Sequence, residues 1–157
     1  FAILSGWANA SDAYHQTASS PEGYGATLAM KSALIVAKLD PADIDYINAH
    51  GTATPNNDLS ESHGIKTVFG SSVPPFSSTK SYVGHTLAAA GVLEAIYSIF
   101  SIRNQEVYPS LRVQEPISDF SFRPVLNYTP GVTIQHVLSN SFGFGGNCTS
   151  LIFSACI

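Results

Sequence analysis

Short apolar segments in the first half of the chain predict buried strands. They are residues 1–7, 44–49 and 75–78, and small or polar residues follow each of them. An apolar run that ends in this way is typical of a strand that leads into a loop. These segments therefore predict three strands of one sheet, each with a loop at its carboxyl end.

Helical patterns lie between these strands. Residues 22–39 carry apolar positions at helical spacing, and Pro41 ends the pattern. The apolar face that we expect for this helix consists of Leu28, Ala29, Leu34, Ile35 and Leu39. Asp58 stands at an expected N-cap with Glu61 three residues later, which predicts a capping box and a helix to about Phe69.

A third helix is predicted by the apolar run 86–102. The run is short for a membrane span, and it contains Glu94, whose charge would be costly in lipid. We therefore expect a buried helix and no membrane association. The segment 109–130 is rich in turn residues and predicts irregular structure.

The end of the chain predicts a hairpin. Residues 133–140 and 149–154 read as strands, and a glycine-rich turn at 143–146 joins them. The complete order alternates strands and helices and closes with two strands, which predicts an α/β domain with helices on a mixed sheet. We expect residues 1–157 to form this single domain.

The composition narrows the classes of function. Charged residues make up 11% of the chain, against about 25% in an ordinary soluble domain, so we expect much of the surface to meet another protein. The net charge of -4 and the lack of a basic cluster argue against nucleic-acid binding. Two cysteines are too few for a disulfide framework, which favours the reducing cytoplasm. The first residues contain no initiator Met or signal sequence, so we expect the chain to begin within a longer protein.

Three loops that follow strands carry candidate chemistry. The loop 49–54 contains His50, the loop 78–86 contains Lys80 and His85, and the turn 140–147 contains Phe-Gly-Phe-Gly-Gly. Ligands of α/β sheets bind beyond the carboxyl ends of the strands, so the three loops are expected to face one pocket. A single histidine is more often structural, but two histidines and a lysine in such loops favour a catalytic site.

The charges of these groups are chemically consistent with one another. A cation near two imidazoles penalises imidazolium, so Lys80 should keep His50 and His85 neutral and able to donate a hydrogen bond. Neutral donors that point at a thioester carbonyl stabilise an enolate-like transition state. Glu94 is the only charge in the run 86–102 and would be costly to bury unpaired, so Lys80 is its expected partner.

Other kinds of site are not indicated. The glycine-rich turn matches neither the dinucleotide fingerprint nor the phosphate loop, and no Gly-x-Ser-x-Gly nucleophile elbow is present. The residues that could ligate a metal do not have a recognisable ligand spacing; they are His15, His50, Asp58, His63 and His85. A metal site is therefore not expected.

Several motifs together resemble the carboxy-terminal half of the elongating β-ketoacyl-acyl-carrier-protein synthases. They span nearly the whole chain and are Ser11-Asp12-Ala13-Tyr14-His15-Gln16-Thr17, Asn48-Ala49-His50-Gly51-Thr52-Ala53-Thr54 with Asn57-Asp58 and Glu61, Ser78-Thr79-Lys80-Ser81, Gly84-His85, Ala89-Ala90-Gly91 with Glu94, and residues 139–146. The resemblance implies a thiolase-like fold, in which this chain is one half of a five-layered αβαβα sandwich. It also implies decarboxylative condensation of a malonyl-carrier thioester with an acyl group held by a cysteine of the amino-terminal half.

The resemblance also implies roles for particular residues. His50, His85 and Lys80 match the catalytic set, with Glu94 and Asp58 in support. The residues that match the phosphopantetheine-binding positions are Thr17, Thr52 and Thr54. Phe144, together with Phe142, matches the gate whose backbone N–H helps to form the oxyanion hole.

Partners follow from the same resemblance. We expect the amino-terminal half of the synthase, an acyl carrier protein and a second copy in a homodimer. No cofactor is expected on the chain itself, because the substrates ride on the phosphopantetheine of the carrier. Without the cysteine half, the isolated chain is expected to be inactive in condensation.

Departures from the family pattern keep two alternatives open. Ala88 replaces a usual glycine, and Asn147-Cys148 replaces a usual Thr-Asn pair. A chain-length-factor-like partner would keep the fold without the chemistry, although the retained histidines and Lys80 argue against it. A thiolase-type acyltransferase would use a second cysteine near the carboxyl end, where Cys148 lies.

Overall fold

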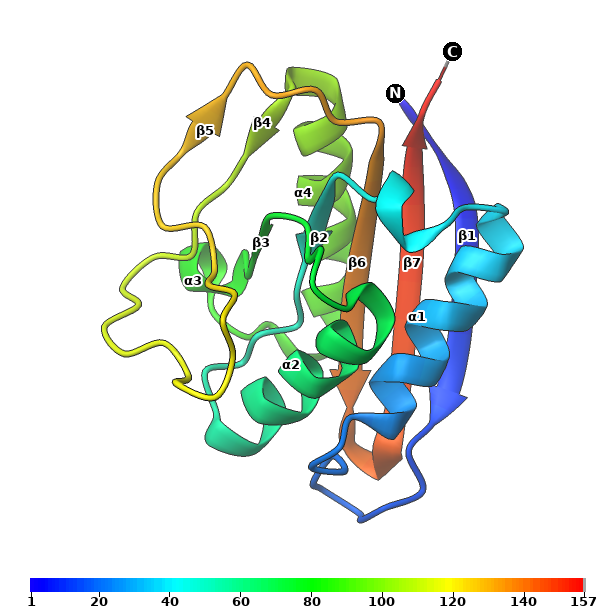
Figure 1. Ribbon diagram of the computed structural model, residues 1–157, viewed down its shortest axis with the longest axis vertical. Coiled ribbons are helices and arrows are strands. Elements are labelled where there is room, and N and C mark those ends of the chain that lie inside the picture. The colour runs from blue at the N-terminus through cyan, green and yellow to red at the C-terminus, as the bar shows by residue number, and fades with distance from the viewer. Residues whose placement is uncertain (157) are drawn as a thin grey trace.

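The computed structural model describes residues 1–156 as a mixed α/β structure (Figure 1). Its helices are α1 (Tyr24–Ala37), α2 (Pro55–Phe69), α3 (Lys80–Val83) and α4 (Ala90–Asn104). Its strands are β1 (Ala2–Ser11), β2 (Tyr46–Asn48), β3 (Phe76–Ser77), β4 (Glu106–Val107), β5 (Thr129–Pro130), β6 (His136–Gly143) and β7 (Asn147–Ala155). Short 3₁₀ turns occupy η1 (Pro41–Asp43), η2 (Leu87–Ala89) and η3 (Phe144–Gly146).

The main sheet has five strands in the order β1-β7-β6-β2-β3. β6 and β7 form the predicted antiparallel hairpin, and β1 pairs antiparallel with β7. β2 lies parallel to both β6 and β3. β4 and β5 form a separate two-stranded sheet, and β5 lies at the end of the segment 109–130 that was predicted to be irregular. The predicted mixed sheet with covering helices is confirmed.

Helices cover both faces of the sheet, so successive residues of its central strands are buried. α1 and α2 lie on one face and α4 on the other (Figure 1). On β6, Leu138 packs into the cluster beneath α1 and α2, whereas Val137 packs into the cluster beneath α4. Successive strand residues point to opposite faces, so both of them are buried here.

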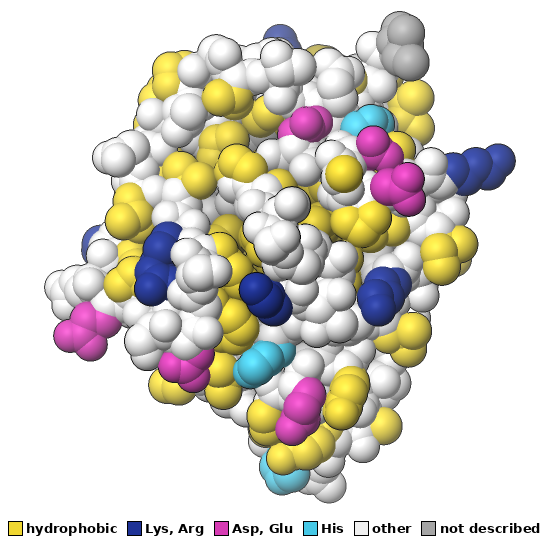
Figure 2. Space-filling view, in the orientation of Figure 1, with side chains coloured by type: hydrophobic (Ala, Val, Ile, Leu, Met, Phe, Trp, Pro, Cys, Tyr) yellow, Lys and Arg dark blue, Asp and Glu magenta, His cyan; other side chains and the backbone are white. Residues whose placement is uncertain are grey.

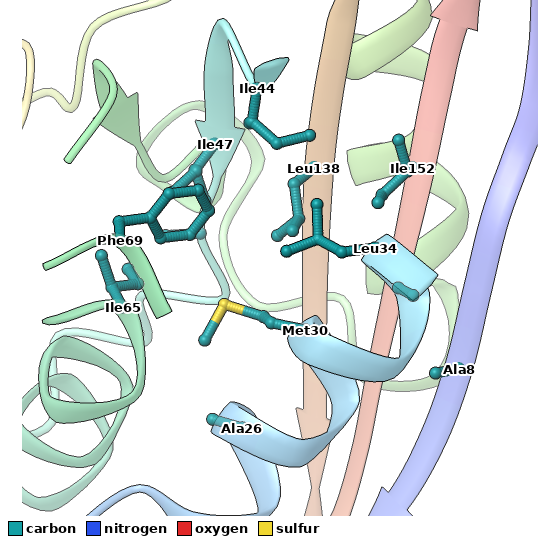
Figure 3. Close-up of a cluster of buried hydrophobic side chains, with 12 residues drawn as sticks. Ala8, Ala26, Met30, Leu34, Ile44, Ile47, Ile65, Phe69, Leu138 and Ile152 are labelled. Carbon is teal, nitrogen blue, oxygen red and sulfur yellow. The ribbon is translucent and has the colours of Figure 1, made fainter. Parts of the chain in front are cut away.

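The larger core cluster joins α1 and α2 to the sheet (Figure 3). Met30 and Leu34 of α1 meet Ile65 and Phe69 of α2 above Ile47 of β2. Met30, Ile47 and Ile65 are at most 1% exposed. This packing places the amino end of α2 beside the loop that follows β2.

The predicted inner face of α1 is partly wrong. Leu28 and Ile35 are 55% and 76% exposed, and the buried side is formed mainly by small residues. The cause is the close approach of β1, because a Cβ atom on Gly6 would lie 2.4 Å from the carbonyl oxygen of Ala33. Large side chains do not fit between backbones at this separation, so they are turned outward.

β1 also differs from its prediction as a short buried strand. It pairs with β7 along its whole length, from Ala2 with Ala155 to Ser11 with Asn147. Its other side is a sheet edge, and alternate residues such as Ile3 and Trp7 are more than half exposed. In residues 1–156, no helix combines the length and apolarity needed to cross a lipid bilayer.

The Gly6 contact predicts an effect on stability. Replacing Gly6 with Ala should lower the free energy of unfolding by about 1–3 kcal/mol, because the new methyl group overpacks the contact between β1 and α1. Urea unfolding followed by circular dichroism measures this change. The matched control is Gly143→Ala, since a Cβ at Gly143 has no neighbouring atom within 4 Å. Equal losses in the two variants would contradict the packing argument.

Candidate active site

His50 lies directly beyond β2 in a loop with a fixed backbone. Its side chain is buried, at 4% exposure. The backbone N–H groups of His50 and Gly51 donate to the two carboxylate oxygens of Glu61, each over 2.9 Å. Gly51 has a φ of 43°, and a Cβ there would lie 2.6 Å from the Cβ of Ser78. The loop that carries His50 is therefore held by α2 on one side and by the loop after β3 on the other.

Glu61 is a site residue that the sequence analysis placed in a family motif without giving it a role in the site. The predicted capping box is wrong, because α2 begins at Pro55 with Thr54 as its N-cap, and Asp58 lies inside the first turn. The buried carboxylate of Glu61 also accepts a hydrogen bond of 3.0 Å from Asn140, whose amide oxygen accepts one of 2.7 Å from Ser150. Burial raises the pKa of Glu61, opposed by the hydrogen bonds from Gly51, Asn140 and His50.

Lys80 and Glu94 form the predicted ion pair, and both are buried. Lys80 is the first residue of α3, a short helix inside the segment predicted as a loop. Its ammonium group also donates to His50, over 3.0 Å to Nδ1 and 2.7 Å to the backbone oxygen. The other carboxylate oxygen of Glu94 accepts a 2.6 Å hydrogen bond from Ser141 at the end of β6. All three predicted loops thus meet at this pair.

His85 lies beside His50 but is exposed to solvent. The two ring centroids are 5.6 Å apart, and the rings are nearly perpendicular at 88°. The backbone N–H of Leu87 donates to Nδ1 of His85 over 3.2 Å. His85 sits in a turn between α3 and η2, before the predicted helix continues as α4.

The hydrogen-bond network assigns the same tautomer to both histidines. Nδ1 accepts a hydrogen bond from Lys80 in His50 and from the Leu87 N–H in His85. In a neutral imidazole one nitrogen accepts and the other carries the proton. Each ring therefore presents an Nε2–H as a hydrogen-bond donor.

The pKa of His50 is strongly depressed, as the sequence predicted in direction. Burial is the largest cause, followed by the charges of Lys80 and His85, and together they lower the pKa of His50 from 6.5 to about 3. The sequence argument named the cation, whereas desolvation contributes more. His50 is therefore a neutral hydrogen-bond donor at physiological pH.

The predicted gate residues lie in different environments. Phe142 is half-buried, and its ring centroid is 5.4 Å from that of His50. Phe144 begins the η3 turn and is 82% exposed. The structure thus brings Phe142 to the histidines and leaves Phe144 on the surface.

The threonines predicted to bind the carrier arm are only partly grouped. The hydroxyl groups of Thr52 and Thr54 are 2.8 Å apart, and Thr52 is the more buried of the two. Thr17 is exposed, and its backbone N–H donates to Nδ1 of His15 over 3.2 Å. Within the described residues, no hydrogen bond joins Thr17 to the other two threonines.

A cleft of about 560 Å³ opens beside these loops. Lys80, His85, Thr52, Asp58 and Glu61 contribute to its lining. Burial raises the pKa of the Asp58 carboxyl, which accepts a 3.1 Å hydrogen bond from Asn57. Across residues 1–156, no three histidine, cysteine or acidic side chains form a group that could hold a metal ion.

The depressed pKa predicts how stability depends on pH. A histidine whose pKa is lower in the folded chain binds a proton more readily when the chain is unfolded. Its contribution to the free energy of unfolding is therefore present above pH 6.5 and is lost as the pH falls toward 3. The His50→Gln variant should therefore show a flatter fall in unfolding free energy over this interval, by up to about 1.4 kcal/mol per pH unit. Urea unfolding at several pH values measures the two slopes, and parallel slopes would contradict the assignment.

A second experiment tests whether burial or the charge of Lys80 contributes more to the low pKa of His50. In a double variant with Lys80→Met and Glu94→Gln, the cation is removed without leaving an unpaired buried charge. The pKa of His50 should rise but stay below 6.5, because burial, its largest cause, remains. Titration of the His50 ring protons by NMR measures it. A return to 6.5 would show that the cation, and not burial, is dominant.

Comparisons with known proteins agree with this geometry. The family model described as "Beta-ketoacyl synthase, C-terminal domain" matches residues 1–114. The chain is 41% identical over 155 residues to 3-oxoacyl-[acyl-carrier-protein] synthase 2 of Staphylococcus aureus, covering 98% of this chain and 37% of that protein. It is 44% identical over 161 aligned residues to the mitochondrial 3-oxoacyl-[acyl-carrier-protein] synthase of Arabidopsis thaliana, covering 99% and 35%.

Solved structures show the same fold. One is a type II polyketide ketosynthase, bound to a hexaketide, in complex with its acyl-carrier protein; it matches with a TM-score of 0.94 at 34% identity over 99% of this chain and 39% of that one. A β-ketoacyl synthase of Burkholderia phymatum STM815 matches with a TM-score of 0.87 at 38% identity over 99% and 38%. The chain spans little more than a third of the length of these relatives. It has the carboxy-terminal half of the thiolase-like fold and belongs to the β-ketoacyl synthase family.

Proposed function

We propose that residues 1–157 form the carboxy-terminal domain of a 3-oxoacyl-acyl-carrier-protein synthase, an acyltransferase of fatty-acid or polyketide elongation. The observation that carries the proposal is the paired arrangement of His50 and His85, whose Nδ1 atoms are both occupied so that both Nε2–H groups are free to donate. Two neutral donors at one oxygen stabilise the negative charge that develops on a thioester carbonyl.

The reaction follows from where this charge develops. The bond between the malonyl carboxylate and the α-carbon breaks and releases carbon dioxide, and its electron pair moves into an enolate whose oxygen accepts hydrogen bonds from His50 and His85. The enolate carbon then attacks the acyl thioester on the cysteine of the amino-terminal half, and the thiolate leaves. Lys80 acts as a positioning residue, since its contacts are to His50 and Glu94.

The partners in this proposal are the amino-terminal half, an acyl carrier protein and a second copy of the intact enzyme. A stripe of exposed apolar side chains supports the first of them, because Val92, Ile96 and Phe100 recur every four residues on α4 and are 64%, 41% and 41% exposed. This spacing places them on one face of the helix. The chain itself would hold no cofactor, and Thr17, Thr52 and Thr54 would contact the phosphopantetheine arm.

The thiol groups support a cytoplasmic location and the synthase reaction. Cys148 and Cys156 are both free. Burial is the main cause that raises the pKa of Cys148 to about 12, so almost none of it is the thiolate that a thiolase-type second cysteine needs.

Alkylation tests this distinction directly. Iodoacetamide at pH 7.5 should modify the exposed Cys156 and leave Cys148 unmodified over the same period, because only an accessible thiolate reacts. Peptide mass spectrometry measures both sites in one sample, and Cys156 serves as the internal control. Rapid modification of Cys148 would favour a thiolase.

Activity is tested in the full-length synthase that contains this chain. With malonyl-carrier and an acyl primer, His85→Ala should lower kcat about 10²-fold or more, because it removes a donor to the developing oxyanion. Radiolabelled β-ketoacyl product measures the rate, and His136→Ala, at the opposite end of β6 from Ser141 and outside the cleft lining, is the control. Full activity without the imidazole would refute the proposed role.

A further inference from the structure

The turn that carries His85 has a left-handed backbone on both sides of the histidine. Gly84 has a φ of 76°, and Leu87 has a φ of 54°. Glycine adopts a positive φ readily, but in any other residue it brings the Cβ close to the following carbonyl oxygen. Leu87 therefore keeps a conformation that its own Cβ disfavours. Such residues persist only where the surrounding structure holds them, and they are concentrated at functional sites.

The contact that accompanies this conformation is made by the backbone of Leu87. Within residues 1–156 its side chain joins no cluster of buried hydrophobic residues, and it is 78% exposed. Its N–H, in contrast, donates to Nδ1 of His85 over 3.2 Å. The side chain of Leu87 thus gives no reason for the positive φ, whereas its N–H connects the residue directly to the candidate active site.

The chain is fixed on both sides of Leu87. Before it, the N–H of Gly84 donates to the carbonyl of Lys80 over 2.8 Å and closes α3. After it, η2 leads directly into α4, which the buried ion pair with Lys80 holds in place. A residue that avoids a positive φ at this position relaxes by rotating the peptide group that joins it to Thr86. This peptide group carries the N–H that His85 accepts.

His85 depends on this N–H more than His50 depends on any single contact. Nδ1 of His50 accepts from the ammonium group of Lys80, which has protons to donate and no acceptor. The ring of His85 is exposed, and within residues 1–156 its one hydrogen bond is the bond from Leu87. The backbone at Leu87 is therefore the part of this chain that determines how His85 carries its proton.

We propose that Leu87 is a positioning residue whose left-handed backbone selects the tautomer of His85 with the proton on Nε2. The inference rests on the proposed function, in which this Nε2–H binds the enolate oxygen. The hydrogen bond at one ring nitrogen decides where the proton of a neutral imidazole resides. If the Leu87 N–H turned away, Nδ1 would be free to carry the proton, and Nε2 would become an acceptor that repels an oxyanion. A catalytic histidine in the wrong tautomer loses orders of magnitude in rate.

Substitutions of Leu87 separate the role of its backbone from that of its side chain. Glycine and asparagine tolerate a positive φ, whereas the β-branched valine does so rarely. In the full-length synthase, Leu87→Gly and Leu87→Asn should keep kcat within about twofold. Leu87→Val should lower kcat at least about tenfold, with little change in KM, because the lost donor acts in the transition state. A role of the apolar side chain gives the opposite order, since valine keeps more of it than glycine. That order, or equal rates in the three variants, would overturn the proposal.

Lys38 offers a matched control for the strain itself. It has a φ of 57° at the carboxyl end of α1, and it is not part of the cleft lining. Figure 2 shows that the Lys and Arg side chains on the face of α1 and α2 stand apart from one another, so the loss of one charge there breaks up no basic patch. Lys38→Val should lower the free energy of unfolding as Leu87→Val does, and it should leave kcat unchanged. An equal loss of kcat in both variants would attribute the effect to stability and overturn the proposal.

The tautomer can be measured without turnover. In the synthase labelled with ¹⁵N in its histidine rings, NMR distinguishes a protonated ring nitrogen from an unprotonated one, and His85→Ala identifies the signals of His85. The unsubstituted enzyme, Leu87→Gly and Lys38→Val should all show the proton on Nε2, and Leu87→Val should show a share of it on Nδ1. An unchanged tautomer in Leu87→Val would overturn the proposal.

Two further outcomes are also decided by these measurements. If Leu87→Val does not fold, Leu87→Gly and Leu87→Asn still test the proposal, because a proton on Nδ1 of His85 in either of them would refute it. If the unsubstituted synthase forms no product, the proposed function fails, and the ¹⁵N signals still decide whether Leu87 selects the tautomer.

Discussion

The buried ion pair between Lys80 and Glu94 organises the candidate active site of this chain. Burying two charges costs several kcal/mol per ion, which is on the order of 10 kcal/mol for the pair. This cost is offset only when the two charges are paired and their remaining hydrogen-bonding groups also have partners. Here Lys80 also donates to His50 twice, and Glu94 also accepts from Ser141. The pair therefore forms only when the loop after β2, the helix α3, the helix α4 and the end of β6 are all in place. Assembly of the site therefore requires these four parts of the fold to be in position.

Much of this site could be predicted, because its signals are local. A single charge in an apolar helix requires a partner, and Lys80 in the loop that precedes the helix was the expected one. The role of Glu61 in holding the loop of His50 could not be predicted, because a glutamate three residues after an aspartate resembles an ordinary capping box. Its true partners are backbone N–H groups ten and eleven residues earlier. Only the packing of α2 against the sheet brings them together.

The features of the fold that could not be predicted also depend on contacts between residues far apart in sequence. The order of strands and helices follows from local patterns, and the structure confirms it. The exposure of the Leu28 and Ile35 side chains could not be predicted from the sequence, because it depends on how closely Gly6 of β1 approaches Ala33. The ends of β1 are set by pairing with β7, almost the whole chain away. In the segment 110–124, the positions of the Phe120 and Phe122 rings likewise depend on contacts with His63 of α2 and Phe76 of β3.

The double contact of Lys80 with the ring and the carbonyl of His50 fixes more than the position of the imidazole. A half-turn of the ring would place a carbon where Lys80 now finds an acceptor and would leave a buried ammonium donor unmatched. The ring is thereby locked against flipping. Its one N–H therefore keeps a constant direction, and the orientation of this donor is a property of the fold.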